Sequence, residues 1–153
     1  MRAHDKTGLR VSAQVLENAA KSIASNQPKN RCVLVVESDP DLQWQLARML
    51  TVDGNRVVGA GSPEGAMAVI EHWPADLVLI AEDLPRISGL ELAQRVRNSN
   101  PDVLVILMAE ANQEVEDERT SSPHITASLV KPFRFEALRS LIESLQLTPA
   151  PAG

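Results

Sequence analysis

The chain has 153 residues, of which 44% are hydrophobic and only 3% aromatic, and its net charge is −5. This size and composition fit one globular domain with an aliphatic core. The single cysteine, Cys32, excludes an internal disulfide, and no apolar stretch approaches the roughly 20 residues of a membrane span, so we expect a cytoplasmic protein without a membrane span.

Charge is divided unevenly along the chain. Residues 1–31 hold six Lys or Arg against two acidic residues, whereas the rest holds nine against eighteen. A basic arm on an acidic body is suited either to fold back on that body or to bind an acidic partner. The body has neither a basic patch nor a DNA-binding motif, so we expect no nucleic-acid binding by this chain alone.

Residues 1–30 are predicted to form an amphipathic helical arm and a linker. Apolar residues recur at helical spacing on one face of this arm, at Leu9, Ala13, Leu16, Ala20 and Ile23. The polar run 26–30 contains Pro28 and favours a linker. Two interpretations stay open: the helix packs on the body or frays in solution, or it serves dimerisation or partner docking.

From residue 31 onward, β-rich runs alternate with amphipathic helical segments. The β-rich runs are 33–36, 57–58, 77–80, 103–107 and 129–130. The helical segments are 41–52, which Gly54 would end, 62–73, which Ser62 and Pro63 would begin, 90–97 and 135–147.

Three of these β-rich runs are apolar throughout, which is typical of a parallel sheet covered on both faces. The sequence therefore predicts a doubly wound α/β domain with five parallel strands over residues 31–147. We expect residues 148–153 to be a disordered tail.

Five fragments carry a family resemblance, and in chain order they are 33–40, 76–81, 84–85, 89–92 and 129–133. Together they resemble a response-regulator receiver domain. The resemblance covers residues 31–147 and implies a flavodoxin-like sheet of order 2-1-3-4-5, with the arm as an N-terminal helical extension. It also implies a cis peptide bond between Lys131 and Pro132.

The resemblance implies where phosphoryl chemistry would lie. Receivers of this family take a phosphoryl group onto an aspartate that ends the third strand, and that position here is Ala81. The acidic pair that helps to hold Mg²⁺ falls on Glu37 and Ser38, with Asp39 just beyond it. Ala81 has no carboxylate to act as the nucleophile, and the loss of two Asp leaves mainly Glu37 for a metal ion.

Two further positions of the family pattern are altered and one is kept. The hydroxyl that receives phosphoryl oxygens is replaced by Met108, and the aromatic residue of the switch by Ser128. Lys131 is retained, and we expect it to form an ion pair with Glu37, with retained binding of a small anion as the alternative. These positions together predict a vestigial pocket with no catalytic residue, no metal and no cofactor.

A neighbouring carboxylate is not expected to stand in for the missing aspartate. Glu82 and Asp83 follow Ala81 directly, but adjacent side chains of a strand face opposite sides of the sheet. A one-residue shift would also upset the spacing to the fragments at 84–85 and 89–92.

The partner face of ordinary receivers follows the fourth strand. Here the segment 110–119 is strongly acidic, and its acids either contact a basic partner or form a solvated face. The candidate interaction surface combines the arm with the last strand and helix, at Leu9, Leu16, Ile23, Ser128, Leu138 and Leu141.

These observations predict a receiver-like protein-interaction or adaptor module of bacterial two-component-type signalling that is not an enzyme and works without phosphorylation. Its partners would be proteins, with a homodimer as one option. Two alternatives stay open: a small-ligand sensor that uses the vacated pocket, and a regulatory fragment of a longer transcription factor or enzyme.

Overall fold

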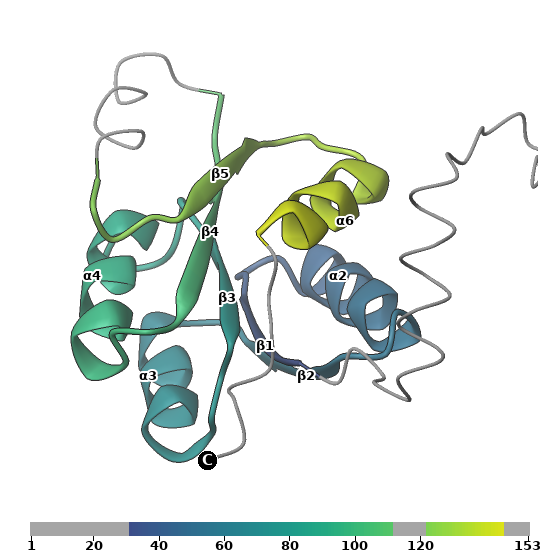
Figure 1. Cartoon of the computed structure of the whole chain (residues 1–153). Coiled ribbons are helices and arrows are strands. Elements are labelled where there is room, and N and C mark those ends of the chain that lie inside the picture. Colours follow the sequence, from purple (N-terminus) through teal and green to yellow (C-terminus); the bar gives the residue numbers. More distant parts are fainter. Residues whose placement is uncertain (1–30, 112–121, 146–153) are drawn as a thin grey trace, which may run out of the picture.

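The computed structural model describes residues 31–111 and 122–145 (Figure 1). The predicted arm, most of the acidic segment and the C-terminal tail lie outside these residues. In chain order the elements are β1 (Cys32–Val36), α2 (Pro40–Val52), β2 (Arg56–Ala60), α3 (Pro63–His72), β3 (Leu77–Ala81), α4 (Gly89–Ser99), β4 (Leu104–Ala109), β5 (Ala127–Val130) and α6 (Phe135–Ser144).

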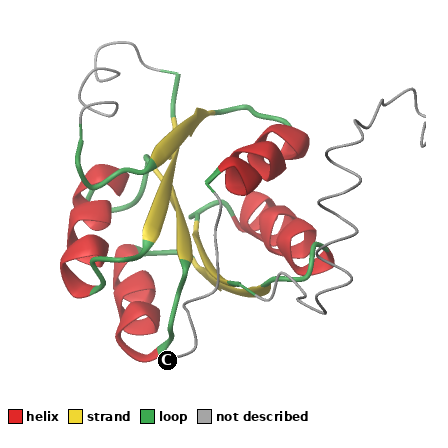
Figure 2. Cartoon of the chain, in the orientation of Figure 1, coloured by secondary structure: helices red, strands yellow, loops and turns green. Residues whose placement is uncertain are grey.

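The five strands form one parallel sheet in the order β2-β1-β3-β4-β5, which confirms the predicted topology. In Figure 2, α2 and α6 lie on one side of this sheet and α3 and α4 on the other. Every residue of β1 and β3 is buried, because both strands are central and covered on both faces. This double cover explains why their sequences are apolar throughout.

Helix ends follow local capping chemistry. Ser62 accepts a hydrogen bond from the backbone N–H of Gly65 (3.1 Å) at the start of α3, as the Ser62–Pro63 pair predicts. Gly54 has a φ of 98° just beyond α2, which confirms it as the helix stop. Asp39 caps α2 by accepting a hydrogen bond from the N–H of Asp41 (3.0 Å).

One residue predicted to lie on the interaction surface is buried in the core. Leu138 is 0% exposed and, with Ile142 one turn later, faces the sheet from α6. The prediction that Leu138 belongs to a partner surface is therefore wrong, because these positions form the buried stripe of the helix. Leu141 is half-buried against the same core, and Ser128 on β5 is exposed.

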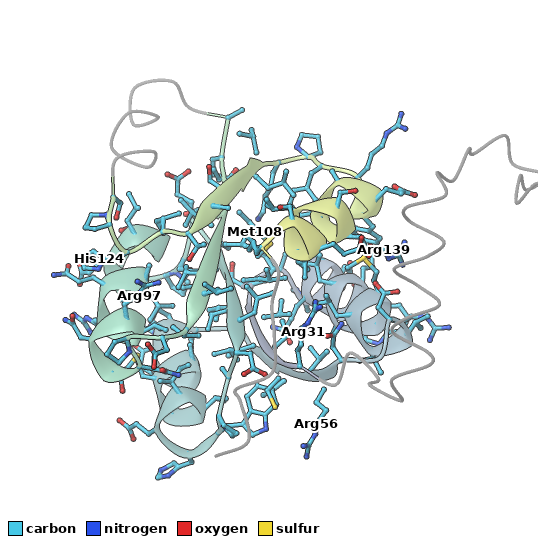
Figure 3. The ribbon with its side chains drawn as sticks, in the orientation of Figure 1. Arg31, Arg56, Arg97, Met108, His124 and Arg139 are labelled. Carbon is cyan, nitrogen blue, oxygen red and sulfur yellow. The ribbon has the colours of Figure 1, made fainter. Side chains whose placement is uncertain are left out.

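An ion pair links the two helices on one face of the sheet. The Nε of Arg139, labelled in Figure 3, donates to Oδ2 of Asp53 at 2.7 Å. Asp53 is the C-cap residue that follows α2, so this ion pair ties α6 to the C-terminal end of α2. Within the two described ranges, no helix combines the length and the apolarity needed to cross a bilayer.

The burial of Leu138 predicts a large stability effect. Leu138→Ala should lower the free energy of unfolding by about 2–5 kcal/mol, because it leaves a cavity between α6 and the sheet. The matched control, Leu141→Ala, removes a half-buried side chain and should cost clearly less. Urea unfolding followed by circular dichroism measures both, and equal losses would contradict the placement of α6.

Candidate functional site

The carboxyl ends of four parallel strands meet at one edge of the sheet. Ala81 at the end of β3 pairs with Met108 of β4, and Ala109 pairs with Val130 of β5. Glu37 follows β1 directly. The structure thus brings Glu37, Ala81, Met108 and Lys131 of the predicted vestigial pocket to one edge of the sheet, whereas Ser38 and Asp39 are exposed. This edge is where open α/β sheets bind ligands.

The centre of this edge is apolar. Ala81 and Met108 are both 0% exposed and lie opposite each other in the sheet (Met108 is labelled in Figure 3). A methyl group and a thioether offer no nucleophile and no strong hydrogen-bond donor. This part of the site therefore continues the hydrophobic core.

A buried ion pair spans the edge from β1 to β5, as predicted. Nζ of Lys131 donates to Oε1 of Glu37 at 2.7 Å, and the two side chains are 20% and 3% exposed. The second oxygen of Glu37 accepts a hydrogen bond from the N–H of Asp39 (3.1 Å). Both oxygens of the buried carboxylate thus have partners, as such a group requires.

A second acid lies within reach of the Lys131 ammonium. Oε2 of Glu110, just after β4, is 3.6 Å from Nζ of Lys131. The backbone N–H of Glu110 in turn donates to Oε1 of Glu82 at 2.7 Å. Carboxylates that follow β1, β3 and β4 therefore connect, through one ammonium and one main-chain amide, into a single polar network.

The register after β3 is unshifted. The N–H of Glu82 donates to the carbonyl of Met108 (2.9 Å), so the β3–β4 ladder continues past Ala81. The carboxylate of Glu82 reaches the start of the loop after β4, and Asp83 is exposed. The carboxylates of Glu82 and Asp83 therefore do not occupy the place of the Ala81 side chain.

The loop after β3 packs against the main chain of Ala81. A Cβ at Gly89 would lie 2.3 Å from the carbonyl oxygen of Ala81, and the N–H of Gly89 donates to the carbonyl of Glu82 (2.9 Å). Only glycine allows so close an approach. The position of α4 is thereby set relative to the end of β3.

A surface ion pair holds the same loop to α3. Arg86 has a φ of 73°, and its Nε donates to Oε2 of Glu64 at 2.8 Å. Hydrogen bonding by the Arg86 guanidinium lowers the pKa of the Glu64 carboxyl to about 2. The sequence does not predict this role of Arg86, since neither its left-handed backbone nor its distant partner leaves a local signal.

A pocket of about 360 Å³ lies beside the ion pair, between the start of α2 and the segment that joins β5 to α6. Its walls are mainly apolar and are formed by Leu42, Gln45, Lys131, Pro132, Phe133 and Phe135. The peptide bond between Lys131 and Pro132 is cis, as the resemblance implies. This pocket is not predicted from the sequence, although two of the chain's few aromatic residues line it.

The residues at this edge do not match the oxygen ligands that Mg²⁺ prefers. Ala81 supplies no oxygen, Ser38 is exposed, and both oxygens of Glu37 are already in hydrogen bonds. Asp39 uses its carboxylate as the cap of α2. Across residues 31–111 and 122–145, no three His, Cys, Asp or Glu side chains are grouped to hold a metal ion.

Comparison with known proteins identifies the family of this chain. Residues 33–143 match the family model described as the response regulator receiver domain. The chain belongs to the response-regulator receiver family. Receiver domains are signalling modules of two-component systems, and the chain is such a module.

Curated relatives of this receiver domain include two regulators of Mycobacterium tuberculosis. It is 30% identical over 138 residues to the probable transcriptional regulatory protein TcrX, which covers 85% of this chain and 56% of the relative. It is 32% identical over 114 residues to the transcriptional regulatory protein PdtaR, over 74% of this chain and 55% of PdtaR. The chain thus spans about half the length of these relatives.

Solved structures agree on the fold. The receiver is similar to the response regulator TrrA of Thermotoga maritima, solved in complex with Mg²⁺ and BeF, at 29% identity and a TM-score of 0.67, covering 75% of this chain and 98% of TrrA. It also resembles the chemotaxis response regulator CheY4 of Vibrio cholerae, at 21% identity, a TM-score of 0.68, and coverage of 75% and 98%.

The buried pair predicts a non-additive pattern of stability. Lys131→Met should lower the free energy of unfolding by about 3–5 kcal/mol, because it leaves the Glu37 carboxylate buried without its counter-ion. The double variant Glu37→Gln/Lys131→Met should lose less than Lys131→Met alone. Urea unfolding of the wild-type chain, the two single variants Glu37→Gln and Lys131→Met, and the double variant forms the cycle.

The control for this cycle is an exposed pair on α4. Nη2 of Arg95 lies 2.9 Å from Oε2 of Glu91. Arg95→Met should change the free energy of unfolding by no more than about 0.5 kcal/mol. A similar small change for Lys131→Met would show that the pair at the sheet edge does not stabilise the fold.

Proposed function

We propose that this receiver domain is an adaptor that binds protein partners without being phosphorylated. The observation that carries the proposal is the pairing of Ala81 with Met108, both fully buried, at the position where the family resemblance puts the phosphoacceptor and its hydroxyl. Formation of an acyl phosphate needs a carboxylate nucleophile at that point. The proposal gives the vestigial pocket, formed by Glu37, Ser38, Asp39, Ala81, Met108 and Lys131, no catalytic role.

The neighbouring acids support the same conclusion. The Glu82 carboxylate is held by the N–H of Glu110, and Asp83 is exposed beyond the end of β3. Either would need a different strand register to reach the place of Ala81, and the close approach of Gly89 to the Ala81 carbonyl opposes that change. A substitute phosphoacceptor is therefore disfavoured.

Charge balance at the sheet edge supports constitutive action. The Lys131 ammonium is neutralised by the buried Glu37, with Glu110 nearby. A phosphoswitch works because added negative charge favours one of two states. Here the ammonium already has its anionic partner within the chain, so we expect one state whose surface is always presented.

The partner surface that fits best is the β5 edge of the sheet. Ser128 and Val130 are exposed on the same side of this strand, and Val130 is 48% exposed. Leu141 of α6 is half-buried, so only part of its side chain could add to this surface. We place the domain at residues 31–147, and we expect it to act in the bacterial cytoplasm, as a monomer or a homodimer.

A second candidate is a regulatory part of a longer transcription factor. The chain spans 56% of TcrX and 55% of PdtaR, both named as transcriptional regulatory proteins. An unphosphorylated receiver would then act on a neighbouring domain through the same β5 edge. The alternative of a small-ligand sensor is supported only by the pocket beside Lys131. The phosphorylation site of the family cannot hold a ligand here, because Ala81 and Met108 are buried in it.

Phosphorylation is tested with acetyl phosphate and Mg²⁺. Intact-mass measurement should show no phosphoryl adduct on the wild-type chain, because the position of Ala81 holds no nucleophile. The triple variant Ser38→Asp/Ala81→Asp/Met108→Thr restores the carboxylates and the hydroxyl and should gain an adduct. A wild-type adduct that disappears in Glu82→Gln would sink the proposal and name Glu82 as the acceptor.

Partner binding is tested by capture from a lysate of the source organism. Val130→Lys should remove the specific partners, because it places a charge on the exposed face of β5. The control His72→Lys alters an exposed side chain on α3 and should retain them. Acetyl phosphate should leave the captured set unchanged, and partners that depend on it would contradict constitutive action.

A further inference from the structure

The outer face of α2 carries large apolar side chains in solvent. Trp44 is 62% exposed and Val52, two turns later, is 72% exposed. Between them Arg48 places its guanidinium carbon 5.5 Å from the centre of the Trp44 ring. Isolated exposed apolar residues are ordinary, but two on one helix face together with an adjoining pocket form an unusual surface.

The exposed face of α2 is continuous with the pocket beside Lys131. Gln45 follows Trp44 on the exposed side of the helix and also lines the pocket with Leu42. We call this surface the α2 track, and it consists of Leu42, Trp44, Gln45, Val52, Phe133 and Phe135. It runs from the pocket at the start of α2 to Val52 at the end of the helix.

The chain enters the domain close to one end of this track. The carbonyl of Arg31 accepts a hydrogen bond from the N–H of Arg56 at 2.8 Å. Arg56 lies four residues after Val52, so the residues before Arg31 join the domain near the C-terminal end of α2 (both arginines are labelled in Figure 3). A segment that precedes Arg31 thus has the α2 track within reach.

We propose that the N-terminal arm, residues 1–30, folds back and occupies the α2 track of its own chain. As a helix, residues 9–23 would be about 21 Å long, against about 16 Å for α2 from Asp41 to Val52. Residues 24–30 reach about 23 Å when extended, which is ample for the turn at Arg31. The arm therefore has the length to cover both α2 and the pocket.

Side-chain spacing matches along the two helices. The arm carries Ile23, Leu16 and Leu9 at seven-residue intervals, or about 10 Å. Val52 and Trp44 are eight residues apart, or about 12 Å. With Ile23 beside Val52, Leu16 falls at Trp44, and Leu9 falls at the pocket.

Charges match in the same alignment. The start of α2 exposes the carboxylates of Asp39 and Asp41, and it would face Lys6 and Arg10, which flank Leu9. Farther along, Arg48 would face Glu17, one of the two acids among residues 1–31. The short linker favours the chain's own arm over that of a second copy by raising its effective concentration.

The occupant has a regulatory consequence that does not depend on whether the domain is phosphorylated. A protein that needs the α2 track must first displace the arm. The affinity of such a protein is reduced by the fraction of chains in which the arm is seated. The exposed residues Ser128 and Val130 of β5 are not part of the α2 track.

The test uses Trp44 as the reporter in the full-length chain. Trp73→Phe leaves Trp44 as the only tryptophan, since the chain contains two. In that background Leu16→Glu should shift the Trp44 emission to longer wavelength and raise its acrylamide quenching about twofold, because a packed helix no longer covers the ring. Val11→Glu makes the same change on the opposite face of the arm and should alter neither reading.

A second variant guards against misfolding of the arm. Val52→Glu lies on the body side of the contact and should raise Trp44 quenching in the same way, while the domain still unfolds in one cooperative urea transition. Equal quenching of Trp44 in all these chains would overturn the proposal. Protection of Trp44 that grows with protein concentration, with a doubled mass in light scattering, would instead assign the track to the arm of a second copy and also overturn it.

Discussion

The ion pair between Glu37 and Lys131 constrains the whole functional edge of this receiver. It joins β1 to β5, which are separated in the sheet by β3 and β4, across 2.7 Å. Either charge alone would be desolvated at a cost of several kcal/mol, so each needs the other in place. The pair therefore constrains where the ends of β1 and β5 lie, and it gives the Lys131 ammonium an anionic partner within the chain.

The other side chains described at this edge of the sheet also contact residues of the same chain. Ala81 and Met108 extend the core up to the loop, and Glu82 holds the main chain after β4. In the family pattern this place takes up a phosphoryl group and helps to hold Mg²⁺. Here the polar groups at this edge are bonded to one another, which favours a single arrangement of the strand ends.

The sequence predicts the strands and helices well because their signals are local, and the family resemblance supplies the strand order. Apolar strands, the Ser62–Pro63 start and the Gly54 stop act within a few residues, and the Glu37–Lys131 pair follows from strand ends that meet at one edge. Leu138 was misplaced because a family-wide partner face says nothing about which side of α6 is buried. The pocket was missed because its walls come from segments about ninety residues apart, from Leu42 to Phe133.

The contact of Gly89 with Ala81 involves only the main chain of residue 81. The turn that follows β3 therefore needs a glycine at position 89 and depends on the main chain of residue 81, whatever its side chain. The main-chain atoms of residue 81 set the packing of the turn, whereas its side chain would carry the chemistry. A single codon change there can remove an activity while the geometry around it persists, which allows such a domain to be inherited for its shape alone.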